Sequence, residues 1–246
     1  MKLLVCISKT PDTTAKIAFK DGDTAFNTDG VQFIMNPYDE WYALVRALEL
    51  KEANGGTVTV INVGPAENDV IIRKALAIGA DDAVRVDAAG STALSVAKEI
   101  AAYAKDQAFD IILTGKETID YSGAEVGGMV AELLSLPYIS FASQLDHDGT
   151  AATVSRDIEG GVEVVKVTGP LVVSASKGMA EQRIPNMRGI MMAKRKPLNV
   201  VASSGAADVV KATKFSLPAA KSGVKMLEAD QMDELVRLLH EEAKVI

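Results

Sequence analysis

The stretch Thr57–Val86, TVTVINVGPAENDVIIRKALAIGADDAVRV, holds the pattern that decides the fold. It opens with a continuous β-branched, apolar run at Thr57–Val63, which is typical of a strand buried on both faces of a parallel sheet. A Gly-Pro pair turns the chain into a helical segment at Ala66–Ile78, which a glycine ends. A second apolar run follows at Ala83–Val86. Strand, helix and strand at this short spacing predict a βαβ unit with a right-handed crossover.

The same alternation continues on both sides of this unit. Further strands are expected at Leu3–Ser8 and Asp110–Leu113, and further helices at Tyr38–Ala53, Ser91–Lys105 and Ser122–Ser135. Ser91 or Thr92 is the expected cap of the second of these helices, since a short hydroxyl side chain can accept from the first free N–H groups. We therefore predict an α/β fold with a Rossmann-like, doubly wound and mostly parallel sheet.

After Pro137 the rhythm changes to strands with little room for helices. The expected strands are Ile139–Leu145, Ala151–Arg156, Val162–Val167 and Leu171–Ala175, with Gly-containing hairpin turns between them. This predicts an antiparallel portion added to the parallel sheet.

The last part of the chain forms a predicted C-terminal arm. Leu198–Pro218 contains the sequence ASSGAAD and is expected to be an irregular linker, whereas Asp230–Ala243 has the apolar spacing of a helix. We predict two parts, an α/β domain over residues 1–180 and an extension over residues 181–246.

Composition excludes several classes of function. The net charge of −7 argues against nucleic-acid binding, which needs a basic surface. A single cysteine, Cys6, excludes an internal disulfide, and two histidines give no indication of a metal site. No apolar run is long enough for a signal peptide or a membrane span, so we expect a soluble, cytoplasmic protein without membrane insertion.

The loop after the fourth expected strand, TGKETIDYSGAEVGG at Thr114–Gly128, is the best candidate for a ligand site. Ligands of doubly wound sheets bind beyond the carboxyl ends of the strands. Glycines such as Gly115 and Gly123 let the backbone approach a ligand, and a helix that begins near Ser122 would offer free N–H groups to a phosphate. The alternative is a Gly-rich turn before a capped helix, because no known phosphate-loop fingerprint is present.

Two other segments are expected at the same edge. Asn36, Pro37, Tyr38 and Asp39 stand where the chain enters its first helix; they could bind a purine or ribose edge, or Asn36 could simply cap the helix with Pro37 as its first residue. Cys6 ends a buried strand and is expected to be a small core residue. We find no Ser–His–Asp set and no paired catalytic carboxylates, which favours binding over bond-making.

The segment Glu181–Pro197 differs from its surroundings. It combines Pro185, Gly189 and a basic C-terminal end with two separate isoleucines and three methionines. A segment this polar and broken is not a core element. It is either a projecting segment with apolar anchors for another protein or an ordinary surface loop that leads into a short helix.

These motifs together resemble the β subunit of electron transfer flavoproteins. The matching segments are LVCISKTPD (Leu4–Asp12), DGVQFIMNPYDE (Asp29–Glu40), INVGPAE (Ile61–Glu67), RKALAIGADDAVRV (Arg73–Val86), LTGKETIDYSGAEVG (Leu113–Gly127), FASQ (Phe141–Gln144) and RDIEGGVEVVKVTGPLVVSA (Arg156–Ala175), followed by Glu181–Lys196. The resemblance implies an adenine nucleotide-binding type of sheet in an αβ heterodimer. FAD is then held mainly by the α subunit and shared at the interface, and a structural AMP is bound by β.

The resemblance also implies site residues and partners. Nucleotide contacts fall on Cys6, Asn36, Pro37, Tyr38, Asp39, Val63, Gly115, Asp120, Ser122, Gly123, Ala124, Glu125 and Val126. Partner contacts fall on Arg183, Ile184, Met187, Ile190 and Met191, with Met187 aligned to the family's apolar anchor and the C-terminal helix packing on the α subunit. Electrons would arrive from flavin dehydrogenases, such as acyl-CoA dehydrogenases, and leave to a quinone oxidoreductase.

One departure from the family pattern and two alternative functions are left open. This chain has threonines near Pro11–Thr14, where some members place a tyrosine against the flavin. A bifurcating branch of the family holds a second FAD in the β cleft and reacts with NADH; it usually has arginine at the place of Lys116, and its cap of the third helix matches Gly90–Ser95 only in part. An ATP-cleaving enzyme on a similar sheet is a third alternative, but Ser8–Asp12 lacks the loop that such enzymes carry.

Overall fold

The computed structural model describes residues 1–90, 92–220 and 223–246. The strands of its main sheet are β1 (Lys2–Cys6), β6 (Thr57–Val63), β7 (Asp82–Asp87), β8 (Ile111–Gly115), β9 (Tyr138–His147), β10 (Ala151–Ile158), β11 (Gly161–Thr168), β12 (Leu171–Ala175) and β13 (Leu198–Ala202). These nine strands lie in the order β11-β10-β9-β12-β8-β1-β6-β7-β13. The helices around it are α1 (Asp39–Asn54), the short 3-10 turn η1 (Ala66–Asn68), α2 (Asp69–Ile78), α3 (Ala93–Ala104), α4 (Val126–Leu134) and α5 (Met187–Ala193).

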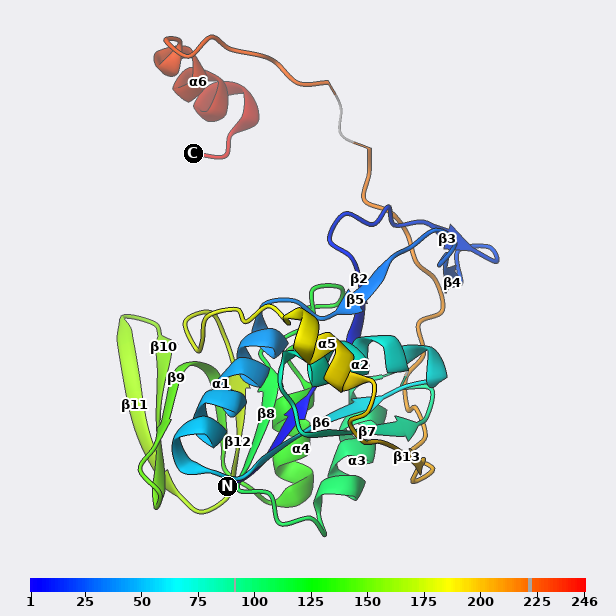
Figure 1. Ribbon diagram of the computed structural model, residues 1–246. Coiled ribbons are helices and arrows are strands. Elements are labelled where there is room, and N and C mark those ends of the chain that lie inside the picture. Colours follow the sequence, from blue (N-terminus) through cyan, green and yellow to red (C-terminus); the bar gives the residue numbers. More distant parts are fainter. Residues whose placement is uncertain (91, 221–222) are drawn as a thin grey trace. The chain divides into compact units, whose positions relative to one another are not determined.

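Both faces of the sheet are covered, which confirms the predicted doubly wound α/β fold. The central strand β1 shows how the sequence achieves this, because successive side chains of a strand point to opposite faces. Leu3 and Val5 pack into the cluster that contains α1 and α2. Leu4 and Cys6 pack into the cluster that contains α3 and α4. Figure 1 shows these two helical layers on either side of the strands.

The predicted antiparallel portion is present, but it is smaller than expected. Strands β9, β10 and β11 pair antiparallel in sequence. Strand β12, however, lies between β8 and β9 and runs parallel to both. Leu171–Ala175 is buried throughout, as expected for a strand inside the parallel part of a sheet.

The predicted irregular linker at Leu198–Pro218 is wrong at its start. Leu198–Ala202 forms β13, which pairs parallel with β7 at one edge of the sheet. The apolar run LNVVA is short and is followed directly by polar residues that begin with Ser203, so the sequence did not indicate a strand here. An edge strand is half-exposed, so its sequence signal is weaker than that of a central strand.

Two further helices agree with expectation in place but differ at their ends. The helix after β6 begins with η1 before α2 takes over at Asp69. Helix α3 is capped by Thr92, whose hydroxyl accepts from the N–H of Ser95 while the Ser95 side chain accepts in return. The alternative cap, Ser91, lies outside the described residues.

Two short antiparallel pairs lie in the segment between β1 and α1. Strands β2 (Lys9–Pro11) and β5 (Phe33–Met35) pair with each other. Strands β3 (Phe19–Lys20) and β4 (Ala25–Phe26) form a short hairpin around Asp21-Gly22.

The chain divides into two compact units. The first comprises Met1–Ile17 and Asn27–Thr213, and the second comprises Ala18–Phe26 and Lys214–Ile246. Within the second, the rings of Phe19 and Phe215 stack at 5.2 Å, and the last helix consists of α6 (Met232–Arg237) and a π-helical segment η2 (Leu238–Ala243). The predicted functional division after residue 180 stays a prediction. In the described part of the chain, no helix is long and apolar enough to cross a membrane.

Candidate functional site

The reversal of strand order lies between β1 and β8. From β1 the chain proceeds to β6 and β7 on one side, and then crosses back to β8 on the other side of β1. Cys6, Val63 and Gly115 are the last residues of β1, β6 and β8. These three parallel strands are neighbours, so the structure brings the three predicted residues to one edge, at the place where doubly wound sheets bind ligands.

Asn36 has a different role from the predicted helix cap. The N-cap position of α1 belongs to Tyr38, an exposed residue with a φ of 63°. Asn36 is fully buried instead. Its amide Nδ2 donates to the carbonyl of Glu117 at 3.0 Å, and its Oδ1 accepts from the N–H of Ile119 at 3.0 Å. Asn36 therefore fastens the loop after β8 to the segment that leads into α1.

Glu40 is a site residue that sequence reasoning missed. It is buried, and its carboxyl accepts from the N–H of Ser8 at 2.7 Å and from the Ser8 hydroxyl. Burial raises the pKa of Glu40 to about 8, against the opposing effect of the hydrogen bonds from Ser8; the nearby Asp120 and Asp39 raise it further. The only sequence signal was an acid in the first turn of a helix, which usually faces solvent.

Gly115 is required by the position of Glu40. A Cβ atom added at Gly115 would lie 2.7 Å from Cγ of Glu40 and 3.2 Å from Cβ of Asp39. The first turn of α1 thus rests directly on the end of β8. The close approach of backbone at Gly115 is made by helix α1 in this structure, and the ligand contact predicted for Gly115 stays a prediction.

The loop after β8 is longer than expected because α4 begins at Val126 rather than near Ser122. Ser122 and Ala124 have φ values of 49° and 52°, in the left-handed region that a right-handed helix cannot contain. The predicted residues Asp120, Ser122, Gly123, Ala124 and Glu125 are exposed in this loop. Left-handed residues other than glycine are strained, and such strain gathers at ligand sites.

The first turn of α4 is the best anion site at this edge. A Cβ at Gly127 would lie 2.7 Å from Oγ1 of Thr114 and 3.0 Å from the Tyr138 hydroxyl, so the helix start sits closely on the end of β8. The Thr114 hydroxyl is buried and has no hydrogen-bond partner among the described residues. Glu125 occupies the N-cap position, yet within the described structure its side chain caps no N–H of the helix. Free N–H groups and an idle hydroxyl are what a phosphate would use.

The carboxylate nearest to the start of α4, Glu125, is exposed at the N-cap and makes no capping hydrogen bond within the described residues, whereas the other helices at this edge carry a carboxylate in or against the first turn. Helix α1 has Asp39 and Glu40 in its first turn, and α2 has Asp69. Helix α3 has its own hydroxyl cap, and Oγ1 of Thr92 donates to Asp208 at 2.7 Å. Negative side chains at these ends compete with any bound anion. Lys116, in the loop after β8, pairs with Glu117 at 3.0 Å.

The segment Glu181–Pro197 forms a loop that leads into the short helix α5. Its root is fixed, because the Arg183 guanidinium pairs with Glu52 at 2.7 Å and the Trp41 ring N–H donates to the Arg183 carbonyl at 3.1 Å. Gly189 lies close to the end of α2, where a Cβ would be 2.4 Å from the Ala77 carbonyl oxygen. The helix is thus held firmly against the domain.

The outer face of this segment is apolar. Ile184 is 79% exposed, Met187 74% and Met191 68%, and Ile190 is also exposed. Of the five predicted partner contacts, four therefore point to solvent, whereas the Arg183 side chain is engaged within the chain. An apolar face on a firmly held support is typical of a protein-binding surface.

Comparisons with known proteins agree on one family. A family model described as electron transfer flavoprotein domain matches residues 23–206. The electron transfer flavoprotein subunit beta of Bacillus subtilis is 40% identical over 260 residues, which cover all of both chains. The subunit of the same name from Bos taurus is 33% identical over 257 residues, covering 100% of this chain and 99% of the other. That of Homo sapiens is 35% identical over 207 residues, covering 82% and 81%.

Proposed function

The chain belongs to the electron transfer flavoprotein family as a β subunit, and on this premise we propose that it binds one AMP at the switch point and docks flavin dehydrogenases through α5. In this proposal the chain forms a heterodimer with an α subunit that holds most of the FAD. The FAD supplies the electron-carrying chemistry. The chain's own residues hold the nucleotide, shelter one side of the interface and present the docking surface.

The observation that supports AMP is the open N-terminus of α4. The idle Thr114 hydroxyl lies under its first turn beside Gly127, where the phosphate would accept from it and from the helix N–H groups. Asn36 fastens the loop that leads from β8 to α4 through two hydrogen bonds at Glu117 and Ile119, on the side of the segment that leads into α1. Cys6 and Val63 then line the far side of the cleft toward the base.

A single phosphate fits the distribution of charge better than two. Of helices α1 to α4, only α4 has neither an acid in its first turn nor a carboxylate hydrogen-bonded to its start within the described residues; the N-cap residue Glu125 is an acid, but its side chain is exposed and caps no N–H. The diphosphate of a second FAD would meet Asp39 or Asp208 at a neighbouring helix end. This favours a simple electron carrier over a bifurcating subunit.

Cofactor stoichiometry tests this part of the proposal. The heterodimer should be purified after co-expression with its α subunit, denatured, and its released nucleotides counted by chromatography. We expect one FAD and one AMP per heterodimer. Two FAD per heterodimer and no AMP would instead establish the bifurcating alternative.

The exposed face of α5 supports the docking role. Met187 stands at the start of the helix, next to the fixed loop, and offers a flexible apolar side chain that adapts to varied pockets. In the proposal, this side chain enters a pocket on a flavin dehydrogenase such as an acyl-CoA dehydrogenase, and the electrons later pass to a quinone oxidoreductase.

Substitution of the anchor tests the docking role. Met187→Ala should weaken docking by roughly 2 kcal/mol, or about thirtyfold in affinity, without any change in flavin content. Dehydrogenase-coupled reduction of the flavin measures the effect. The matched control is Met226→Ala, a substitution of another exposed methionine outside this segment. Equal rates for the two variants would show that the anchor assignment is wrong.

A further inference from the structure

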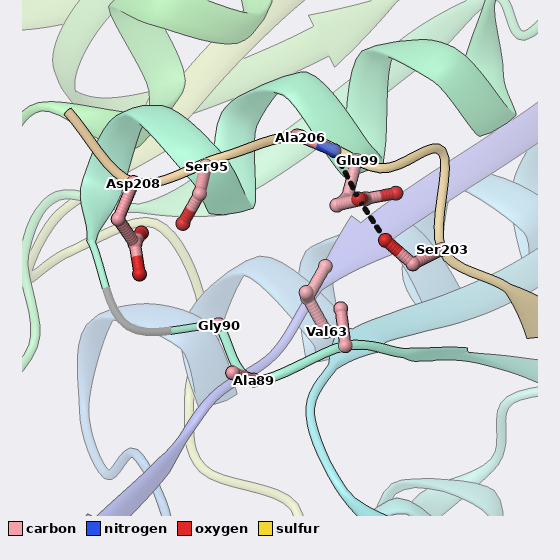
Figure 2. Close-up of a pocket in the computed structure, with 9 residues that line it drawn as sticks. Val63, Ala89, Gly90, Ser95, Glu99, Ser203, Ala206 and Asp208 are labelled. Atoms are coloured by element: carbon pink, nitrogen blue, oxygen red, sulfur yellow. Dashed lines mark hydrogen bonds between the residues drawn. The ribbon is translucent and has the colours of Figure 1, made fainter.

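A cavity of about 100 Å³ lies beyond the ends of β6 and β7, beside Val63 (Figure 2). One side is formed by the backbone at Ala88–Gly90, and another by Ser95 and Glu99 of α3. The third side is formed by Ser203, Ala206 and Asp208, which follow β13. We call Ser203–Asp208 the strap.

The strap is held mainly by one buried carboxylate. Glu99 is only 3% exposed, and it accepts three hydrogen bonds from the strap. The donors are the Ser203 hydroxyl at 2.5 Å, the Ser204 N–H at 2.7 Å and the Ala206 N–H at 3.2 Å. Figure 2 shows the carboxylate of Glu99 directed at Ser203 and Ala206. Charge-assisted bonds of this kind are the strong ones.

The far end of the strap is fastened at the start of α3. Oγ1 of Thr92 donates to Oδ1 of Asp208 at 2.7 Å. Between its two attachments the strap consists of small residues that are mostly exposed, and Gly205 takes a φ of 84°. Little apolar burial therefore holds the strap, so its polar attachments at Glu99 and at Asp208 decide whether it stays closed.

The Glu99 carboxylate can be satisfied with hydrogen bonds whether the strap is closed or open. Burial alone would raise the pKa of Glu99, but the hydrogen bonds from the strap outweigh burial and keep the pKa below its ordinary value. With the strap open, water replaces the lost donors at the carboxylate. Glu99 thus has the properties of a latch rather than of a fixed core residue.

The strap lies next to a predicted nucleotide contact, because Val63 lines the same cavity as Ser203, Ala206 and Asp208. Val63 lines the cavity, and it is also one of the residues predicted to contact the nucleotide. Resting on the proposed AMP site, we propose that Glu99 is a positioning residue for nucleotide retention, because it latches Ser203–Asp208 as the outer wall beside Val63. Opening of the strap then precedes release of the nucleotide.

The experiment measures nucleotide release from the purified heterodimer. Glu99→Gln keeps the size of the side chain but removes the charge and one of the two acceptor oxygens. We expect AMP to dissociate about tenfold faster after dilution, with unchanged FAD content, since hydrogen bonds to charged groups are stronger than neutral ones. Ser203→Ala removes one donor of three and should accelerate release about threefold.

Two additional readouts separate the latch from general destabilisation. Hydrogen exchange at the amides of Ser204 and Ala206 should accelerate in Glu99→Gln, whereas protection of the β1 and β8 amides should not change. The matched control is Glu132→Gln, which changes an exposed glutamate on the neighbouring helix α4. The control should release AMP at the wild-type rate.

Each outcome decides one of the two proposals. If the strap amides lose protection in Glu99→Gln but AMP leaves at the wild-type rate, the latch proposal is overturned and the AMP site stands. If wild-type heterodimer contains no nucleotide, the AMP site fails and retention fails with it. If Glu99→Gln does not assemble, the threefold effect of Ser203→Ala carries the test, and its absence overturns the latch.

Discussion

The N-termini of α3 and α4 have similar surroundings but opposite chemistry. Both helices cover the same face of the sheet and share one apolar cluster, and both begin at its carboxyl edge. The start of α3 is filled by the chain itself, through the Thr92–Ser95 capping box and the contact with Asp208. The start of α4 offers backbone N–H groups and the idle Thr114 hydroxyl. The difference teaches that a doubly wound fold offers several anion sites, and the sequence selects one by filling the others.

Filling the start of α4 should cause the largest loss of AMP affinity. In Gly127→Ala the new methyl meets Thr114 and Tyr138 at 3.0 Å or less. Overpacking of this kind costs about 1 to 3 kcal/mol, and the displaced Thr114 hydroxyl should lower AMP affinity at least roughly tenfold. Titration calorimetry on nucleotide-free heterodimer measures the affinity.

The adjacent glycine provides the control for this change. In Gly128→Ala the methyl would meet only Tyr138, at an ordinary contact distance of 3.4 Å. Alanine is the better helix former, so this variant should gain up to about 1 kcal/mol in stability with unchanged AMP affinity. Equal AMP affinity in the two variants would remove α4 as the phosphate site.

Removing the Thr114 hydroxyl tests how much this single group contributes to AMP binding at the start of α4. Thr114→Val keeps the shape of the side chain and deletes a buried polar atom that has no partner among the described residues. We expect the nucleotide-free protein to be as stable as wild type or more stable, while AMP binding weakens by about 1 kcal/mol, or roughly fivefold. Thermal unfolding with and without AMP measures both effects. A loss of stability in the nucleotide-free state would instead indicate a structural role for the hydroxyl.

The smallest effect is expected at α3. Thr92→Ala removes the capping hydroxyl and its bond to Asp208. Loss of an N-cap costs about 1 kcal/mol, which corresponds to a fall of about 2 to 4 °C in Tm for a chain of this size. AMP affinity at equilibrium should stay within about twofold of wild type, since this end holds no ligand in our proposal. A large loss of AMP affinity in Thr92→Ala would show that the start of α3 also takes part in AMP binding.

The central fold was predictable because its strands are buried on both faces. Thr57–Val63 and Leu171–Ala175 are almost wholly apolar or β-branched, which leaves little choice of structure. Strand β13 was missed because an edge strand needs only one buried face. The parallel direction of β12 was missed because the hairpin signals before it suggested continued antiparallel pairing.

Within the candidate site, the strand ends were predictable and the side-chain partners were not. Cys6, Val63 and Gly115 follow from the strand boundaries alone. Asn36 bonds to a loop more than 80 positions away, and no local pattern distinguishes this from a helix cap. Glu40 and Glu99 look like ordinary helix-surface acids until the fold places Ser8 and Ser203 beside them.

The position of β12 has a consequence for how the chain assembles. Strands β1, β6 and β7 are adjacent and complete by residue 87, so they can form a local nucleus early in synthesis. Strand β8 is made next and pairs with β1. Strands β9 to β11 follow, but they cannot join these strands directly, because β12 must first insert between β8 and β9. Until residue 175 has emerged, the hairpin exposes an unpaired edge, and pairing of this non-local kind is slow. The folding rate of the domain should therefore be set by the arrival of β12, and this strand is where a chaperone or a stalled ribosome would have most influence.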